Sequence, residues 1–74
     1  MEEFLINFKD LFEDDEAQNI LPETKFRELE SWDSIMGLSV IGMIDDEYGV
    51  EFNADDMRKC QTVKDIFELV ERKK

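Results

Sequence analysis

Apolar side chains recur every three or four residues near the start of the chain. They are Met1, Phe4, Leu5, Phe8, Leu11 and Phe12. This spacing puts them on one face of an α-helix, and Glu2 and Glu3 fall in the first turn, where the helix dipole favours acidic groups. An acidic run at residues 13–16 ends the stripe. The pattern therefore predicts a first amphipathic helix.

Residues 17–33 show no sustained period, and Pro22 disfavours a long helix there. Loops of this length are uncommon unless they are functional or are packed down by their own side chains. The apolar residues available for that packing are Ile20, Leu21, Phe26, Leu29 and Trp32. We expect a long first loop that contains a short turn at residues 23–26.

A second helix is predicted over residues 34–48. Asp33 and Ser34 can each cap its start, because the oxygens of both side chains can accept a hydrogen bond from the first free N–H groups. Gly49 fits the left-handed conformation that commonly ends a helix. Residues 50–52 then form an extended connector.

Two helix-start signals follow at Asn53 with Asp56 and at Thr62 with Asp65. Both match the capping box, in which two residues three apart satisfy each other's backbone N–H groups. The first predicts a short third helix that ends near Cys60, which we interpret as a small buried apolar residue. The second predicts a fourth amphipathic helix that continues to about residue 71.

These elements predict an all-α fold, a single domain over residues 1–74. It is a four-helix bundle with three longer helices, one short helix and a long first loop. The expected core consists of Phe4, Leu5, Phe8, Phe12, Leu29, Val40, Ile41, Ile44, Tyr48, Phe52, Val63, Ile66, Phe67 and Val70.

The two faces of the predicted helix at 34–48 differ in character. Projection at 100° per residue puts Val40 and Ile44 at the centre of the core face, with Met36, Ile41, Met43 and Tyr48 beside them. The opposite face collects Ile35, Leu38, Ser39, Gly42, Asp45 and Asp46. Exposed aliphatics next to carboxylates are typical of a transient docking surface, although scattered surface aliphatics are also normal.

The chain carries a net charge of −11. This excess of acid disfavours binding to nucleic acid and to anionic membranes, because both need basic residues. The charge is unevenly spread: residues 34–57 hold six acids and no base. Such a segment attracts basic protein partners at low salt.

Several chemistries lack the residues that they need. The chain has no His, which excludes His-based catalytic triads and imidazole metal ligands. Neither acidic run matches a calcium-binding loop, so we predict no metal site, and a chain of this size has little volume for an enclosed catalytic pocket. The single Cys indicates a reducing compartment and hence a cytoplasmic protein, and no apolar run is long enough for a membrane span. We further expect a monomer that is not an enzyme.

Ser34 lies where the long loop meets a helix N-terminus. The first N–H groups of a helix have no internal partners, and the helix dipole favours anions there, so a phosphate ester on this serine is electrostatically favourable. A dipeptide such as Asp33-Ser34 taken alone is usually a helix cap and nothing more.

The order of the motifs adds to that pattern. Trp32-Asp33-Ser34-Ile35 opens an amphipathic helix that ends at Gly49, and a connector, a short capped helix and a last amphipathic helix follow. This arrangement resembles the acyl carrier protein family, whose Asp-Ser-Leu motif appears here with Ile35 in the Leu position. The likeness is clearest from Phe26 to Val70.

The resemblance implies a carrier. The serine that matches Ser34 receives 4′-phosphopantetheine covalently, from a phosphopantetheinyl transferase, and the arm then holds acyl groups as thioesters. In the family, the residue that matches Asp33 helps the transferase and its metal ion to engage the site. The helix after the serine docks on basic patches of acyl-processing enzymes, which implicates Ile35, Leu38, Asp45 and Asp46. The implied processes are fatty-acid synthesis or related polyketide and cell-envelope pathways.

One departure and one alternative accompany this interpretation. Many fatty-acid carriers place acids soon after the serine, where this chain has Met36, Gly37 and Ser39, and this difference favours a specialised pathway. The alternative function is an acidic helical adaptor that binds a basic partner noncovalently. The adaptor explains the charge and the helices equally well but leaves the position of Asp33-Ser34 without a role.

Overall fold

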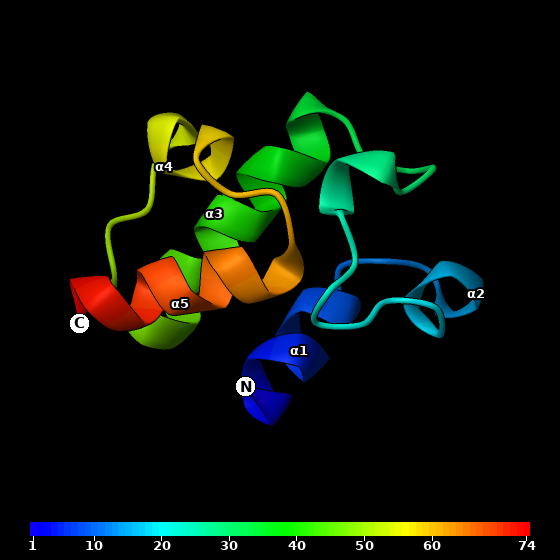
Figure 1. The fold of residues 1–74 in the computed structure, drawn as a ribbon, viewed down its shortest axis with the longest axis horizontal. Helices are drawn as coiled ribbons and strands as arrows, with labels where there is room; N and C mark the ends of the chain where they lie inside the picture. The colour runs from blue at the N-terminus through cyan, green and yellow to red at the C-terminus, as the bar shows by residue number, and fades with distance from the viewer.

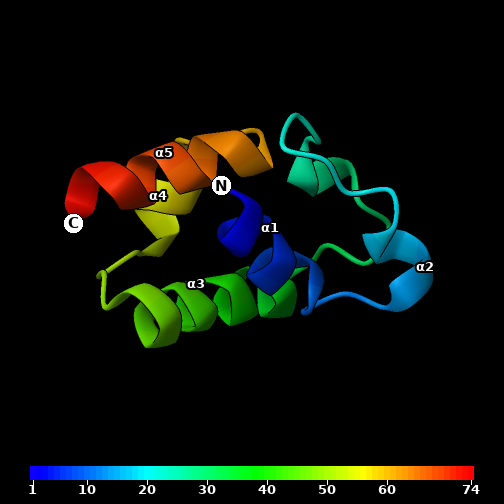
Figure 2. The ribbon, with the colours of Figure 1, turned by 90° about the horizontal axis from the view of Figure 1, so that it is seen from below.

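The computed structural model describes residues 1–74 and contains helices but no β-strand. Its elements are α1 (Glu2–Lys9), α2 (Asp14–Ala17), the 3-10 helix η1 (Phe26–Glu28), α3 (Ser34–Tyr48), α4 (Ala54–Arg58) and α5 (Val63–Lys73). The expected all-α class with three longer helices is confirmed. Figures 1 and 2 show α1, α3, α4 and α5 gathered together, with α2 at the far end of the molecule. No helix has both the length and the apolar character needed to cross a membrane.

The core lies between the longer helices. Figure 2 shows α3 and α5 on opposite sides, with α1 between them. Phe4 of α1 bridges these two sides, since its ring centroid lies 5.8 Å from that of Tyr48 and 5.6 Å from that of Phe67. The amide of Asn7 also donates a hydrogen bond to the Tyr48 hydroxyl (3.2 Å). Aromatic packing therefore fixes α1 against both other long helices.

Most of the expected core is confirmed. Nine of the fourteen side chains are buried, and the other five, Leu5, Leu29, Ile41, Tyr48 and Phe67, are partly buried against them. Cys60 is buried as predicted, and burial raises the pKa of its thiol to about 11. The core also contains side chains that the prediction omitted. They are Ile20, Phe26, Val50 and Met57.

The long first loop is more structured than the sequence indicates. Ile20 and Phe26 are fully buried, but Leu21 is exposed, so its predicted packing role is wrong. The acidic run forms α2, an additional short helix that the apolar pattern does not reveal, since it has no buried residue. The predicted turn at 23–26 lies slightly before η1.

Arg27 attaches this loop to the C-terminal end of α4. Its guanidinium donates hydrogen bonds to the carbonyl oxygens of Met57 (2.8 Å) and Cys60 (2.7 Å). The Met57 carbonyl belongs to the last turn of α4, and the Cys60 carbonyl lies two residues beyond the end of the helix. A cation at that end also complements the helix dipole. Arg27 thus holds η1 and α4 together across 30 residues of sequence.

Both predicted capping boxes are present. Asn53 and Asp56 exchange side-chain and backbone hydrogen bonds at the start of α4, and Thr62 and Asp65 do so at the start of α5. The buried carboxylate of Asp56 also forms an ion pair with Lys73 of α5 (3.0 Å). The third helix ends at Arg58, two residues before the predicted end, and α5 continues to Lys73.

The capping carboxylate of Asp65 makes the stability of the fold depend on pH. Its pKa lies below the usual 3.8 because the N–H groups of Gln61 and Thr62 donate to it. Since the folded pKa is lowered, this contribution is complete above pH 3.8 and is lost as pH falls through the folded value. We expect Asp65→Ala to lower the free energy of unfolding by about 1 kcal/mol near neutral pH. The difference in unfolding free energy between the parent chain and the variant should shrink in strong acid. Urea unfolding near neutral pH and in strong acid measures it, and an equal difference under the two conditions would contradict this role.

Candidate functional site

The N-terminus of α3 is capped by Asp33. Its carboxylate accepts a hydrogen bond from the Met36 N–H (2.8 Å), and its carbonyl oxygen accepts from the Gly37 N–H (3.0 Å). Of the two candidates for the cap, the structure therefore selects Asp33, and Ser34 becomes the first residue of the helix. At the other end Gly49 adopts φ 63°, the predicted left-handed stop.

The Ser34 side chain is exposed, and its hydroxyl makes no hydrogen bond within the protein. The other five hydroxyl-bearing side chains each have a partner. Ser31 binds Glu16, Ser39 donates to the Ile35 carbonyl, Tyr48 accepts from Asn7, and Thr24 and Thr62 accept from backbone N–H groups. Because Asp33 supplies the cap, the Ser34 hydroxyl is left free for other chemistry.

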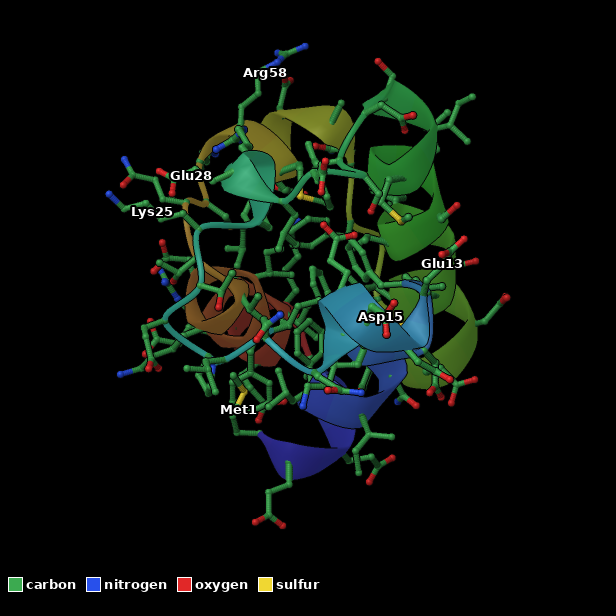
Figure 3. The ribbon with its side chains drawn as sticks, turned by 90° about the vertical axis from the view of Figure 1, so that its right-hand side faces the viewer. Met1, Glu13, Asp15, Lys25, Glu28 and Arg58 are labelled. Atoms are coloured by element: carbon green, nitrogen blue, oxygen red, sulfur yellow. The ribbon has the colours of Figure 1, made fainter.

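Two open grooves adjoin the start of α3. The arginine groove, of about 530 Å³, lies beside Ser34 and is mostly apolar; its walls include Arg27, Trp32, Ser34, Leu38, Met57 and Arg58. The acidic groove, of about 900 Å³, has Met36 and the carboxylates of Glu13, Asp15, Glu16, Glu28 and Glu30 in its walls. In Figure 3, Asp15 lies on α2 toward the viewer and Glu13 immediately precedes this helix, whereas Arg58 projects from the upper edge.

The outward face of α3 matches the helical projection. Val40 and Ile44 are fully buried, whereas Ile35 and Leu38 keep 73% and 66% of their surface exposed. Asp45 and Asp46 are also exposed, about two helical turns beyond Leu38. The predicted docking residues thus share one accessible face that begins next to Ser34.

The acids on this face stand at the unfavourable end of the helix. Asp45, Asp46 and Glu47 occupy the last turn of α3, which contains no basic residue. The helix dipole places partial negative charge there, so carboxylates are destabilising in that position. None of these three carboxylates forms an ion pair within the fold. Such an arrangement favours a role outside the folded chain.

Sequence reasoning missed the two arginines beside Ser34. They come from η1 and from the end of α4, and only the folded loop brings them to the same groove. The one clue in the sequence was that Arg27 is the last basic residue before the cation-free segment 34–57 and Arg58 is the first one after it. Met36 and Met43 both pack against the core, but Met36 also lines the acidic groove, whereas Met43 lines neither groove.

The site has the chemistry of an acceptor. No His exists in the chain to remove the Ser34 proton, and the Asp33 carboxylate is engaged in the cap. The exposed hydroxyl and the adjoining open groove leave room for a covalently attached arm.

Comparisons with known proteins agree with this chemistry. Residues 7–70 match the family described as "Phosphopantetheine attachment site". The chain is also 28% identical over 58 residues to the acyl carrier protein of Thermosynechococcus vestitus, which covers 78% of this chain and 72% of that protein. The chain therefore belongs to the phosphopantetheine-attachment family, whose members are non-catalytic carriers with a covalently bound 4′-phosphopantetheine.

Proposed function

We propose that the chain carries acyl groups on an arm attached to Ser34. The observation that carries this proposal is the free Ser34 hydroxyl at the N-terminus of α3, the one hydroxyl in the chain without an internal hydrogen bond. A phosphodiester there gains from the positive end of the helix dipole. The thiol at the end of the arm is the group to which an acyl cargo binds as a thioester.

Attachment requires a separate phosphopantetheinyl transferase. The Ser34 oxygen forms a bond to the phosphorus of coenzyme A that bears the pantetheine, and the bond from that phosphorus to the bridging pyrophosphate oxygen breaks. The adenosine bisphosphate half leaves with that oxygen, and the hydroxyl proton passes to a base of the transferase. We assign Asp33 a second role here, in which its exposed carboxylate helps the transferase and its metal ion to engage the site.

We propose that α3 is also the docking element. Ile35 and Leu38 supply an apolar contact next to the attachment residue, and Asp45 and Asp46 supply negative charge further along the same face. An apolar centre with a charged border gives both affinity and orientation. The partners are then the transferase and acyl-processing enzymes with basic patches.

The class of pathway follows from the distribution of charge on that face. The relative in Thermosynechococcus vestitus is named an acyl carrier protein, which supports fatty-acid synthesis or a related polyketide or cell-envelope pathway. Met36, Gly37 and Ser39 leave the arm end of α3 without acids. Carriers with acids near the serine would then have different partners, so we propose a specialised pathway for this chain. We also propose that residues 1–74 form a single monomeric carrier domain.

The test is the intact mass of the full chain. Incubation with coenzyme A and a broad-specificity phosphopantetheinyl transferase should add the mass of one phosphopantetheinyl group. Protein purified from its native host should show the same addition plus the mass of any cargo. A chain that stays unmodified under both conditions would contradict the carrier function and leave the noncovalent adaptor as the explanation of the acidic face.

A further inference from the structure

Two grooves that differ in charge adjoin the start of α3. Five carboxylates and no Lys or Arg line the acidic groove. The arginine groove has two guanidinium groups and a single carboxylate, that of Asp33. The arginine groove is thus locally basic although the chain carries a net charge of −11. The contrast between the two grooves determines on which side of α3 an anion attached to Ser34 is more stable.

The two arginines differ in how freely they can move. Arg27 is fixed, because its guanidinium donates to the Met57 and Cys60 carbonyls. Arg58 forms an ion pair only with Asp55, and both side chains are about three-quarters exposed (74% and 77%). Exposed ion pairs contribute little to stability, so Arg58 can exchange this partner at small cost. A guanidinium binds phosphate through two parallel N–H groups, which makes phosphate a strong competitor.

We propose that Arg58 binds the phosphodiester on Ser34 and so directs the arm into the arginine groove between α3 and α4. This inference rests on the proposed attachment at Ser34. The apolar walls at Trp32, Leu38 and Met57 then pack against the carbon chain of the arm. The carboxylates of the acidic groove repel the same phosphate. Arg58 is therefore a positioning residue, and the arm rests on the α4 side of α3 when no partner is bound.

Two methionine methyl groups can show on which side of α3 the arm lies. Met57 lines the arginine groove and Met36 lines the acidic groove. In the full chain labelled at its methionine methyl carbons, loading of the arm should shift the NMR signal of Met57 more than that of Met36. Raised salt should weaken the Met57 response, because the phosphate contact is ionic. A larger shift at Met36, or no shift at either methyl, would overturn the inference.

The matched variants are Arg58→Gln and Lys59→Gln. Both remove one positive charge at adjacent exposed positions, but Lys59 is not among the residues of the arginine groove. We expect Arg58→Gln to reduce the Met57 shift to about half or less, Lys59→Gln to preserve it, and Arg58→Lys to restore part of it. Equal behaviour of the two Gln variants would contradict the role of Arg58. Intact mass separates the two proposals, since an unloaded chain contradicts attachment, whereas a loaded chain without the Arg58 effect contradicts only this inference.

Discussion

Ser34→Ala should abolish attachment of the arm completely, because no other hydroxyl combines exposure, a free oxygen and a helix N-terminus. The substitution should leave the fold intact. Asp33 provides the cap through its own carboxylate, so an alanine at the first helical position is expected to change the free energy of unfolding by no more than about 0.5 kcal/mol. Intact mass after treatment with coenzyme A and the transferase measures the first effect, and chemical denaturation measures the second.

Ser31 and Ser39 provide matched controls on either side. Ser31 lies in the preceding loop with its hydroxyl bound to Glu16, and Ser39 lies one turn into α3 with its hydroxyl bound to the Ile35 carbonyl. Ser31→Ala and Ser39→Ala should therefore accept the arm normally. If Ser31→Ala or Ser39→Ala failed to accept the arm while Ser34→Ala accepted it, the assignment of Ser34 as the attachment residue would be wrong.

The helices could be predicted because their limits depend on neighbouring residues. The cap of α3, the Gly49 stop and the two capping boxes each involve groups within a few residues of one another. The apolar period of α3 likewise separates Val40 and Ile44 from the exposed Ile35 and Leu38. Local hydrogen bonding and a period of 3.6 residues carry this information in the sequence itself.

The first loop could not be predicted in the same way. Its order depends on long-range contacts, such as the hydrogen bonds from Arg27 to the end of α4 and the hydrogen bond from the Phe26 N–H to the Gln61 carbonyl (3.3 Å). Such contacts produce no periodic pattern of apolar residues in the sequence. For the same reason the grooves near Ser34 were not foreseen, since the arginine groove combines η1, α3 and α4.

The end of α3 shows a conflict between stability and recognition. Three acids in its last turn oppose the helix dipole, and residues 34–57 contain no cation to offset them. A Lys in that turn would be favourable for the isolated domain, by about 0.3–1 kcal/mol per site. The presence of the three acids is explained if a basic surface of a partner protein neutralises them in the complex.

Reversal of Asp45 and Asp46 together to Lys should separate these two effects. We expect the double variant to be at least as stable as the parent chain, but its kcat/KM as a substrate of its transferase or acyl-processing enzymes should fall by about tenfold to a hundredfold at low salt. The loss should diminish as salt rises, because it arises from screened charge attraction. Steady-state kinetics with the carrier as the varied substrate measure the loss, and circular dichroism and urea unfolding measure the fold.

The control for that variant is Glu23→Lys with Glu68→Lys. These two glutamates are exposed, form no ion pair, lie outside α3 and change the net charge by the same amount. If net charge alone governed the encounter, both double variants would lose activity equally, and the docking role of α3 would be refuted. A loss confined to the Asp45 and Asp46 variant, together with equal or higher stability, would show that these acids are positioned for a partner at the expense of the helix that bears them.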